Sequence, residues 1–297
     1  MKKALFWLGI LLGLQIVIAL TLYASNQSQD QTESRPLLSA GTLPERLVID
    51  DGKHRADVAK VNGEWRLPDL DNLPANTSKI EGLLSKLKQT KTRWPQTTTA
   101  SSHKRFEVAP EQFQRHVSLW QDGNKSIEFY LGTSPGYRQT HLRRADETAV
   151  YSVPLQNYDF PSQNEDWLDK RLIAVSAITE LNGPDYHLRK TDSDWHLADA
   201  GEDELDPDRV QALIRSLENL RVQGIADQPE GDAELVLSVR AGNSNYEFRF
   251  WKNGDDHVIQ RSDRAQTFTV SKYDYELLIE ATRESLLRKP EAENGAG

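Results

Sequence analysis

Gly63-Glu64-Trp65-Arg66-Leu67 is matched 130 residues later by Ser193-Asp194-Trp195-His196-Leu197. Behind each stretch, apolar residues recur with the spacing i, i+3, i+4 and i+7, which is typical of one face of an α-helix. These residues are Ile80, Leu83, Leu84 and Leu87 in the first copy and Val210, Leu213, Ile214 and Leu217 in the second. The repetition predicts one structural unit present twice. We expect Trp65 and Leu83, with Trp195 and Leu213, to anchor the two cores.

Capping and turn residues support the same elements. Asn76 and Asp206 stand before the two helical stretches, where their side chains suit the N-cap position. Asp122-Gly123 and Asn253-Gly254 separate segments of alternating polarity, as turns do in β-hairpins. Each copy is therefore expected to hold an antiparallel sheet.

The offset between the copies falls from 130 at the helices to 119 at Gly123 and Gly242, and to 117 at Tyr151 and Phe268. The first copy thus carries eleven extra residues, located between Leu87 and Val117.

The predicted fold class is α+β, with two tandem units that each place one helix on an antiparallel sheet. We expect the first unit at 46–174 and the second at 175–289. Each unit is predicted to end in a short helix, at 166–173 and at 275–288.

The N-terminus predicts a membrane anchor. From Ala4 to Ala24, Gln15 and Thr21 are the only polar side chains, and a helix of this length spans roughly 31 Å. Lys2 and Lys3 precede the run, so we expect residues 1–24 to cross the cytoplasmic membrane once, with the N-terminus in the cytoplasm and the bulk of the chain outside. A cleaved signal peptide is the alternative, but Leu22-Tyr23-Ala24 lacks the small-x-small pattern of a cleavage site.

Gly9 and Gly13 form a small-xxx-small pair within the predicted anchor. This spacing lets membrane helices approach closely, so it predicts packing against a partner's membrane helix or a second copy of the chain. The alternative is that the two glycines reflect only the usual composition of membrane helices. Residues 25–45 are rich in Ser and Gln and are predicted to be a flexible linker, and 290–297 a disordered tail.

Composition excludes several classes of function. Lys and Arg number 36 against 45 Asp and Glu, a net charge of −9, which argues against nucleic acid as a partner. The chain has no cysteine, so thiol catalysis, cysteine-ligated zinc and disulfides are excluded, and an oxidising compartment suits it.

The ordered features resemble a bacterial family, the domain of unknown function 4340. The resemblance rests on the order and duplication of the motifs from about residue 46 to 289, since no single motif is specific. The second copy departs from the pattern at Phe250-Trp251, where the first has Leu131-Gly132. The other matching stretches are Trp65-Arg66-Leu67, Ile80 to Leu87, Val150 to Val153, Trp167 to Leu172, and Trp195 to Leu197.

The resemblance implies an anchored envelope protein, since members of that family are often encoded beside gliding-motility-type ABC transporter components. It implies membrane subunits of such a transporter as partners. It supplies no catalytic residues, because none are defined for the family.

No catalytic constellation emerges from the motifs. Phosphate-binding glycine loops are absent. Ser85-Lys86-Leu87-Lys88 and Ser162-Gln163-Asn164 fit two motifs of serine transferases, but the third, K-T-G, is missing. Ser134 lies in a stretch that lacks the G-x-S-x-G spacing. An envelope hydrolase is therefore the weakest hypothesis, and we expect no catalytic residue and no cofactor.

No metal site is expected either. Asp255-Asp256-His257 follows a turn signal, which explains its polarity without a bound ion. The acidic run from Glu202 to Asp208 precedes a predicted helix, where negative charge is favoured by the helix dipole.

One basic cluster stands out in this acidic chain. It is predicted to face anionic lipid headgroups or an acidic partner, with a solvated strand face as the alternative. Its central residues are Arg138, His141, Arg143 and Arg144, and it also includes Lys104, Arg105 and Arg115.

Two functions from different classes remain. The first is a non-enzymatic, single-pass envelope protein that serves as an extracytoplasmic accessory or scaffold of an ABC-type transport assembly. The second is a binding module for an envelope lipid or polysaccharide, using the basic cluster or a groove of the duplicated body.

Overall fold

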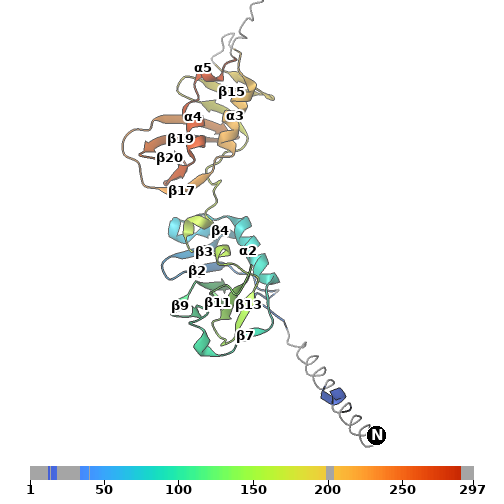
Figure 1. Ribbon diagram of the computed structural model, residues 1–297. Helices are drawn as coiled ribbons and strands as arrows, with labels where there is room; N and C mark the ends of the chain where they lie inside the picture. The colour runs from blue at the N-terminus through green and yellow to red at the C-terminus, as the bar shows by residue number, and fades with distance from the viewer. Residues whose placement is uncertain (1–12, 14, 19–33, 40, 199–203, 289–297) are drawn as a thin grey trace, which may run out of the picture. The chain divides into compact units, whose positions relative to one another are not determined.

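The computed structural model describes residues 13, 15–18, 34–39, 41–198 and 204–288. The chain divides into two compact units, Met1–Leu168 and Asp169–Gly297. Both are mixed α/β units in which all strand pairs of the described ranges are antiparallel (Figure 1).

The first unit is built on a long antiparallel sheet. Its central strands are β2 (Arg46–Asp50), β10 (Arg115–Gln121) and β11 (Asn124–Leu131), and their inward side chains Leu47, Ile49 and Phe129 are fully buried. Across the sheet the strands run in the order β5 (Leu73–Pro74), β4 (Glu64–Leu67), β3 (Arg55–Val61), β2, β10, β11, β12 (Thr140–Arg144), β13 (Val150–Val153) and β7 (Pro95–Thr97).

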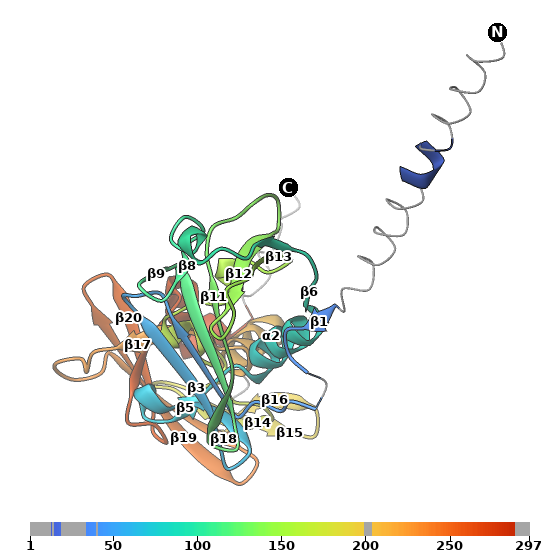
Figure 2. The same cartoon turned by 90° about the horizontal axis from the view of Figure 1, so that it is seen from below.

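Helix α2 (Thr77–Gln89) begins where the sequence predicts it. The Asn76 side chain accepts a hydrogen bond from the Lys79 amide at 3.0 Å, which caps the helix. Ile80, Leu83 and Leu87 are buried, whereas Leu84 is only partly buried. The short strand β1 (Arg35–Pro36) lies at one end of α2, as Figure 2 shows.

The second sheet has the same strand order, except that β5 has no counterpart among the strands described. Its helix α3 (Pro207–Glu218) is capped by Asp206 and packs with α4 (Lys272–Ile279) and α5 (Arg283–Leu286) (Figure 1). The order is β16 (Asp194–Leu197), β15 (His187–Thr191), β14 (Ile178–Asn182), β18 (Leu235–Ala241), β19 (Ser244–Asn253), β20 (Asp256–Arg261), β21 (Thr267–Val270) and β17 (Val222–Ala226).

Hairpin turns lie at the predicted glycines. Asp122 and Gly123 both have positive φ, 52° and 74°, which is the conformation of the tight turn that joins β10 to β11. Gly254, with φ of 61°, lies in the turn between β19 and β20.

The extra residues of the first copy form a small structure of their own. It contains η2 (Ala100–Ser102), β8 (Val108–Ala109) and β9 (Gln112–Phe113), and β8 packs against β11 and β12. Val108 joins Tyr130 and Val150 in a separate buried cluster. The insertion therefore packs over strands β11 and β12 of the first sheet.

The predicted linker at 25–45 is wrong for its second half. Residues Arg35 and Pro36 form β1, which pairs with β6 (Lys91–Thr92), and the side chains of Leu37 and Leu38 are each only 1% exposed. Two adjacent leucines bury enough apolar surface to hold this stretch on the first unit. The two leucines stand in a stretch otherwise rich in Ser and Gln, so composition alone predicted a linker.

The boundary between the units also differs from the predicted one at 174. Residues 169–174 belong to the second unit because they bond to it: the amide of Val222 donates to the carbonyl of Lys170, and Arg261 donates to the carbonyl of Ala174. The predicted terminal helix at 166–173 is instead a 3-10 turn, η4 (Asn164–Trp167), followed by a further turn, and 275–288 forms parts of α4 and α5.

No helix of the described ranges is long and apolar enough to cross a membrane. Of the predicted anchor, only residues 13 and 15–18 fall within those ranges, where they are helical. The rest of Ala4–Ala24, including Gly9, lies outside the described residues, as does the predicted tail.

Gly132 supplies a test of packing in the first unit. A β-carbon at this position would overlap the backbone carbonyl oxygens of Phe106 and Glu107, whereas one at Gly136 would meet nothing within 4 Å. Gly132→Ala should therefore lower the free energy of unfolding by about 3 kcal/mol or more. Gly136→Ala should change it by less than about 1 kcal/mol. Urea denaturation of the two variants measures both, and equal midpoints would contradict the packing described.

Candidate functional site

The chain joins the first unit through a short segment, Arg35–Leu38, here called the strap. Its two strand residues pair with Thr92 and Lys91 of β6, and the amide of Leu37 donates to the carbonyl of Thr90 at 2.8 Å. The hydroxyl of Thr92 donates to the carbonyl of Arg35 at 3.1 Å. Arg35, Pro36 and Leu37 of the strap are thus paired with the residues that follow α2.

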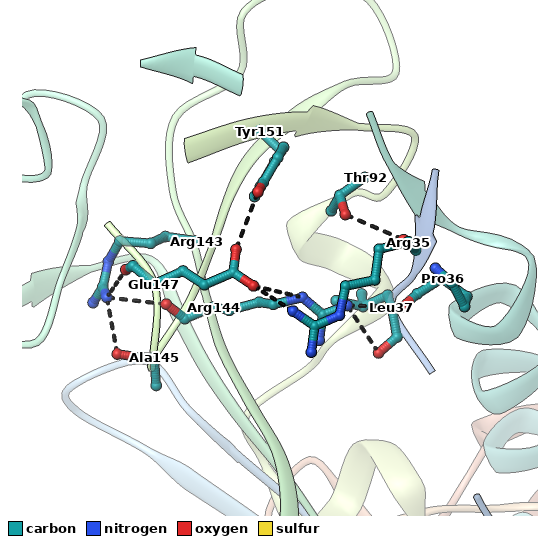
Figure 3. Close-up of polar contacts among 9 residues, drawn as sticks. All are labelled: Arg35, Pro36, Leu37, Thr92, Arg143, Arg144, Ala145, Glu147 and Tyr151. Atoms are coloured by element: carbon teal, nitrogen blue, oxygen red, sulfur yellow. Dashed lines mark hydrogen bonds and ion pairs between the residues drawn. The ribbon is translucent and has the colours of Figure 1, made fainter. Parts of the chain in front are cut away.

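Arg144, the last residue of β12, fixes the strap from the side of the sheet. Its guanidinium donates to the carbonyl of Pro36 at 2.8 Å and to that of Leu37 at 3.4 Å (Figure 3). Only 6% of Arg144 is exposed. A buried guanidinium has five N–H donors that need acceptors, so the two carbonyls stabilise its charge. The same hydrogen bonds fix the position of the strap backbone.

Glu147 provides the counter-charge. Its Oε1 accepts from Arg35 at 2.7 Å and lies 3.8 Å from Nε of Arg144, while Oε2 accepts from the hydroxyl of Tyr151 at 3.1 Å (Figure 3). Burial and this hydrogen bond raise the pKa of Tyr151, so it remains a neutral donor.

Burial and neighbouring charges act on Arg144 in opposite directions. Burial lowers the pKa of Arg144, and the positive charge of Arg35 adds to the effect, whereas Glu147 opposes it. Arginine nevertheless keeps its charge inside proteins. Arg35 and Arg144 also line a polar hollow of about 410 Å³, together with Lys125 and Glu128.

The second unit repeats this arrangement with Arg261. In the register of the sheets, Arg144 lies opposite Phe129 and Arg261 lies opposite Phe248, at matching places. Arg261 is 5% exposed and donates to the carbonyl of Ala174 at 3.1 Å. Ala174 belongs to the segment that leads into the second unit, as Pro36 does for the first, and Asp263 supplies the counter-charge at 2.5 Å.

Sequence reasoning missed this pair, although the signal was present. Arg144 and Arg261 are 117 residues apart, the same offset that relates Tyr151 to Phe268. Extending the repeat to polar positions would have identified them.

The predicted basic patch is corrected by the structure. His141, Arg143 and Arg144 are 6%, 4% and 6% exposed, because β12 is covered by the insertion and by the strap. Nε of Arg143 donates to the carbonyl of Val108 at 2.7 Å, and its guanidinium lies 4.7 Å from the ring centre of Tyr130. These side chains therefore do not form a surface for lipid or for an acidic partner.

The other members of that cluster are scattered. Arg138, Lys104 and Arg105 are exposed, and Arg115 is half-buried, where it donates to the carbonyl of Phe160 at 2.7 Å. Arg138 has φ of 55° in the loop before β12.

The four predicted core anchors differ in burial. Trp65, Leu83 and Leu213 are 4%, 6% and 2% exposed. Trp195 is only partly buried and lines a hollow of about 470 Å³. Gly13 has open space around its α-carbon, and its predicted partner Gly9 is not among the described residues.

The serine motifs occupy structural positions. Ser162 is buried and its hydroxyl donates to Asp51 at 2.5 Å, and Ser134 donates to the carbonyls of Gly136 and Gln139. Ser85 accepts from Gln89 one turn later on α2, at 3.3 Å. Within the described ranges, no group of three or more His, Cys, Asp or Glu is arranged to hold a metal ion.

A family model described as a domain of unknown function, DUF4340, matches residues 65–238, which is more than half of the chain. The match extends from β4 of the first unit to β18 of the second. No curated protein and no solved structure matches the chain. The resemblance inferred from the ordered motifs is confirmed.

Replacing Arg144 tests the attachment of the strap. Arg144→Met should lower the free energy of unfolding by about 3 kcal/mol, because it leaves the carbonyls of Pro36 and Leu37 without their donor and removes the positive charge beside Glu147. It should also speed hydrogen exchange at the amide of Leu37. Arg35→Met is the matched control, since Arg35 is 62% exposed and its ion pair is worth at most about 1 kcal/mol. Equal protection of Leu37 in both variants would contradict this account.

His141 predicts a dependence of stability on pH. Burial lowers its pKa, opposed by a hydrogen bond with Thr133. The unfolded chain therefore binds more protons between the lowered value and about 6.5, the ordinary pKa of histidine. The contribution of His141 to the free energy of unfolding should be complete above about pH 6.5. It should decrease as the pH falls below that value. His141→Gln should flatten this dependence in denaturation curves measured from pH 7.5 to pH 5. The exposed control His196→Gln should leave it unchanged.

Proposed function

This chain belongs to the DUF4340 family, and we propose that it is a non-enzymatic, single-pass envelope protein that serves as an extracytoplasmic accessory or scaffold of an ABC-type transport assembly. In this proposal Ala4–Ala24 holds the chain in the cytoplasmic membrane, with Lys2 and Lys3 on the cytoplasmic side. Both folded units then lie outside that membrane.

The strap is the observation that carries the proposal. Residues 25–34 are all that separate the apolar run from Arg35, and ten residues reach at most about 35 Å when fully extended. Because the strap is fixed to the first unit by Arg144 and by the burial of Leu37 and Leu38, the unit would stay close to the membrane surface. That is where an accessory can meet the exposed parts of transporter membrane subunits.

The described part of the apolar run supports the anchor. Ile16, Val17 and Ile18 are helical and 51%, 57% and 49% exposed. Exposing three successive apolar side chains to water costs free energy. Burying them in lipid would remove that cost. Gly13 has no side chain, so the backbone of another membrane helix, from a transporter subunit or from a second copy of the chain, could approach it closely.

The alternative, a binding module for an envelope lipid or polysaccharide, loses support from the burial of His141, Arg143 and Arg144. The polar hollow beside the strap is lined by Arg35, Lys125 and Arg144 and by Glu128 and Asp146, and Arg144 is already bound to the carbonyls of Pro36 and Leu37.

Crosslinking in cells tests the proposed role. Tagged full-length protein, crosslinked and identified by mass spectrometry, should capture membrane subunits of an ABC-type transporter. Gly9→Leu with Gly13→Leu should reduce that capture severalfold, because the bulkier side chains prevent close packing of helices. Ile16→Leu with Ile18→Leu is the matched control, since it changes shape without closing the glycine face. Capture of the protein alone would contradict the accessory role, and release of the protein from membranes by alkaline carbonate would contradict the anchor.

A further inference from the structure

Strands β11 and β12 of the first unit continue beyond the sheet as a narrow hairpin. Gly136 pairs with Gln139 in an isolated bridge, which leaves Tyr137 and Arg138 as the two residues of the turn. The Tyr137 side chain is 85% exposed, and the guanidinium of Arg138 lies 5.1 Å from the centre of its ring. An aromatic ring and a positive charge are thus presented together at the end of the hairpin.

A second exposed tyrosine lies beside the hairpin, in η3 (Asn157–Asp159). The side-chain amide of Asn157 donates to the carbonyl of Gly132 at the base of the hairpin, at 3.1 Å. Tyr158 is 75% exposed, so that it and Tyr137 are the two most exposed large apolar or aromatic side chains of the described residues. Tyr137, Arg138 and Tyr158 are here called the tyrosine tip.

The second copy of the repeat lacks this surface. At the offset of 117 residues, the three members of the tip correspond to Gly254 for Tyr137, Asp255 for Arg138 and Tyr275 for Tyr158. Tyr275 is 3% exposed, and its hydroxyl donates to Glu234 at 2.9 Å. The fold of a unit therefore does not require exposed rings or a positive charge at these positions.

The surroundings of the tip carry little free negative charge. Residues 129–145 and 150–158 contain no Asp or Glu. Two acidic side chains lie nearby: that of Asp159 is paired with Lys86, and that of Glu107 accepts from Gln114 at 2.6 Å. The charge of Arg138 would therefore attract an anionic surface.

The length of chain before the strap brings such a surface within reach. Residues 25–34 span at most about 35 Å, so in the proposed function the first unit stays near the membrane but can turn different sides toward it. The chemistry of its surface then selects the side. Trp94, just before β7, is also exposed, but it follows the strap's partner β6 and adjoins residues outside the described ranges, so the tip is defined without it.

We propose that the tyrosine tip lies in the headgroup layer of the membrane that holds the anchor, with Arg138 against the phosphates of anionic lipids. Tyrosine rings are amphipathic and favour the interface between membrane and water, and basic side chains are attracted to anionic lipid. The inference rests on the anchor of the proposed function. It adds a second point of attachment, which gives the first unit one orientation on the membrane.

A fluorescent reporter beside the tip tests the contact. The chain has no cysteine, so Gly136→Cys supplies a single labelling site, where a β-carbon meets nothing within 4 Å. Asn124→Cys is the matched control, because Asn124 is exposed at the other end of β11, more than about 20 Å from the hairpin. Labelled full-length chain is reconstituted into vesicles that contain phosphatidylglycerol and a lipid with a nitroxide quencher on its headgroup. The label at position 136 should be quenched at least about threefold more strongly than the label at position 124.

Substitutions in the tip identify the groups responsible. Tyr137→Ser with Tyr158→Ser should reduce quenching of the label at position 136 at least about twofold. Tyr273→Ser is the matched control, since Tyr273 is 72% exposed in the second unit, and it should change nothing. Arg138→Gln should reduce quenching in vesicles with phosphatidylglycerol but not in vesicles of phosphatidylcholine alone. Thermal unfolding of each variant establishes that loss of contact is not loss of fold.

A third reporter separates this inference from the proposed function. Thr21→Cys places a label in the predicted anchor, where a quencher attached to the lipid acyl chains should reach it. An unquenched label at position 21 would overturn the anchor and this inference together. If the label at position 21 is quenched while those at positions 136 and 124 are quenched alike, the inference alone is overturned. Unchanged quenching after replacement of both tyrosines would overturn it as well.

Discussion

Each unit depends on a buried arginine that ties its leading segment to its sheet. Arg144 donates to Pro36 and Leu37, and Arg261 donates to Ala174, from matching places in the two sheets. Each arginine is only 5–6% exposed, so its charge is stabilised by the carbonyls that accept from it and by a neighbouring carboxylate, Glu147 for Arg144 and Asp263 for Arg261. Removing either partner would leave an unpaired polar group in the interior.

This constraint explains why the strap behaves as part of the first unit. Apolar burial of Leu37 and Leu38 supplies the stabilisation, while the arginine fixes the register in which those leucines are placed. If the chain is anchored as proposed, the same contacts would keep the first unit within a short distance of the anchor.

Duplication has preserved the framework and altered the edges. Both copies keep the strand order, the capped helix and the buried arginine. The first copy adds the insertion that buries Arg143 and His141, and it covers β4 with β5. In the second copy Trp195 stays partly exposed next to an acidic stretch.

Much of the framework could be predicted from local signals. The N-caps Asn76 and Asp206, the apolar stripes of both helices and the glycines of the hairpins depend on residues close together in sequence, and the structure places all of them as expected. The strap and the boundary at Leu168 could not be predicted this way, since each depends on contacts with residues far along the chain.

The basic cluster shows most clearly where prediction from the sequence fails. By itself, the sequence determined the repeat, the helices and turns, the family and an apolar N-terminal run, because periodicity and turn chemistry are local properties. Only the tertiary structure decided that His141, Arg143 and Arg144 lie inside and that Trp195 is accessible where Trp65 is not. A charged side chain can be buried wherever distant carbonyls and a carboxylate satisfy it, and those partners come together only when the chain folds.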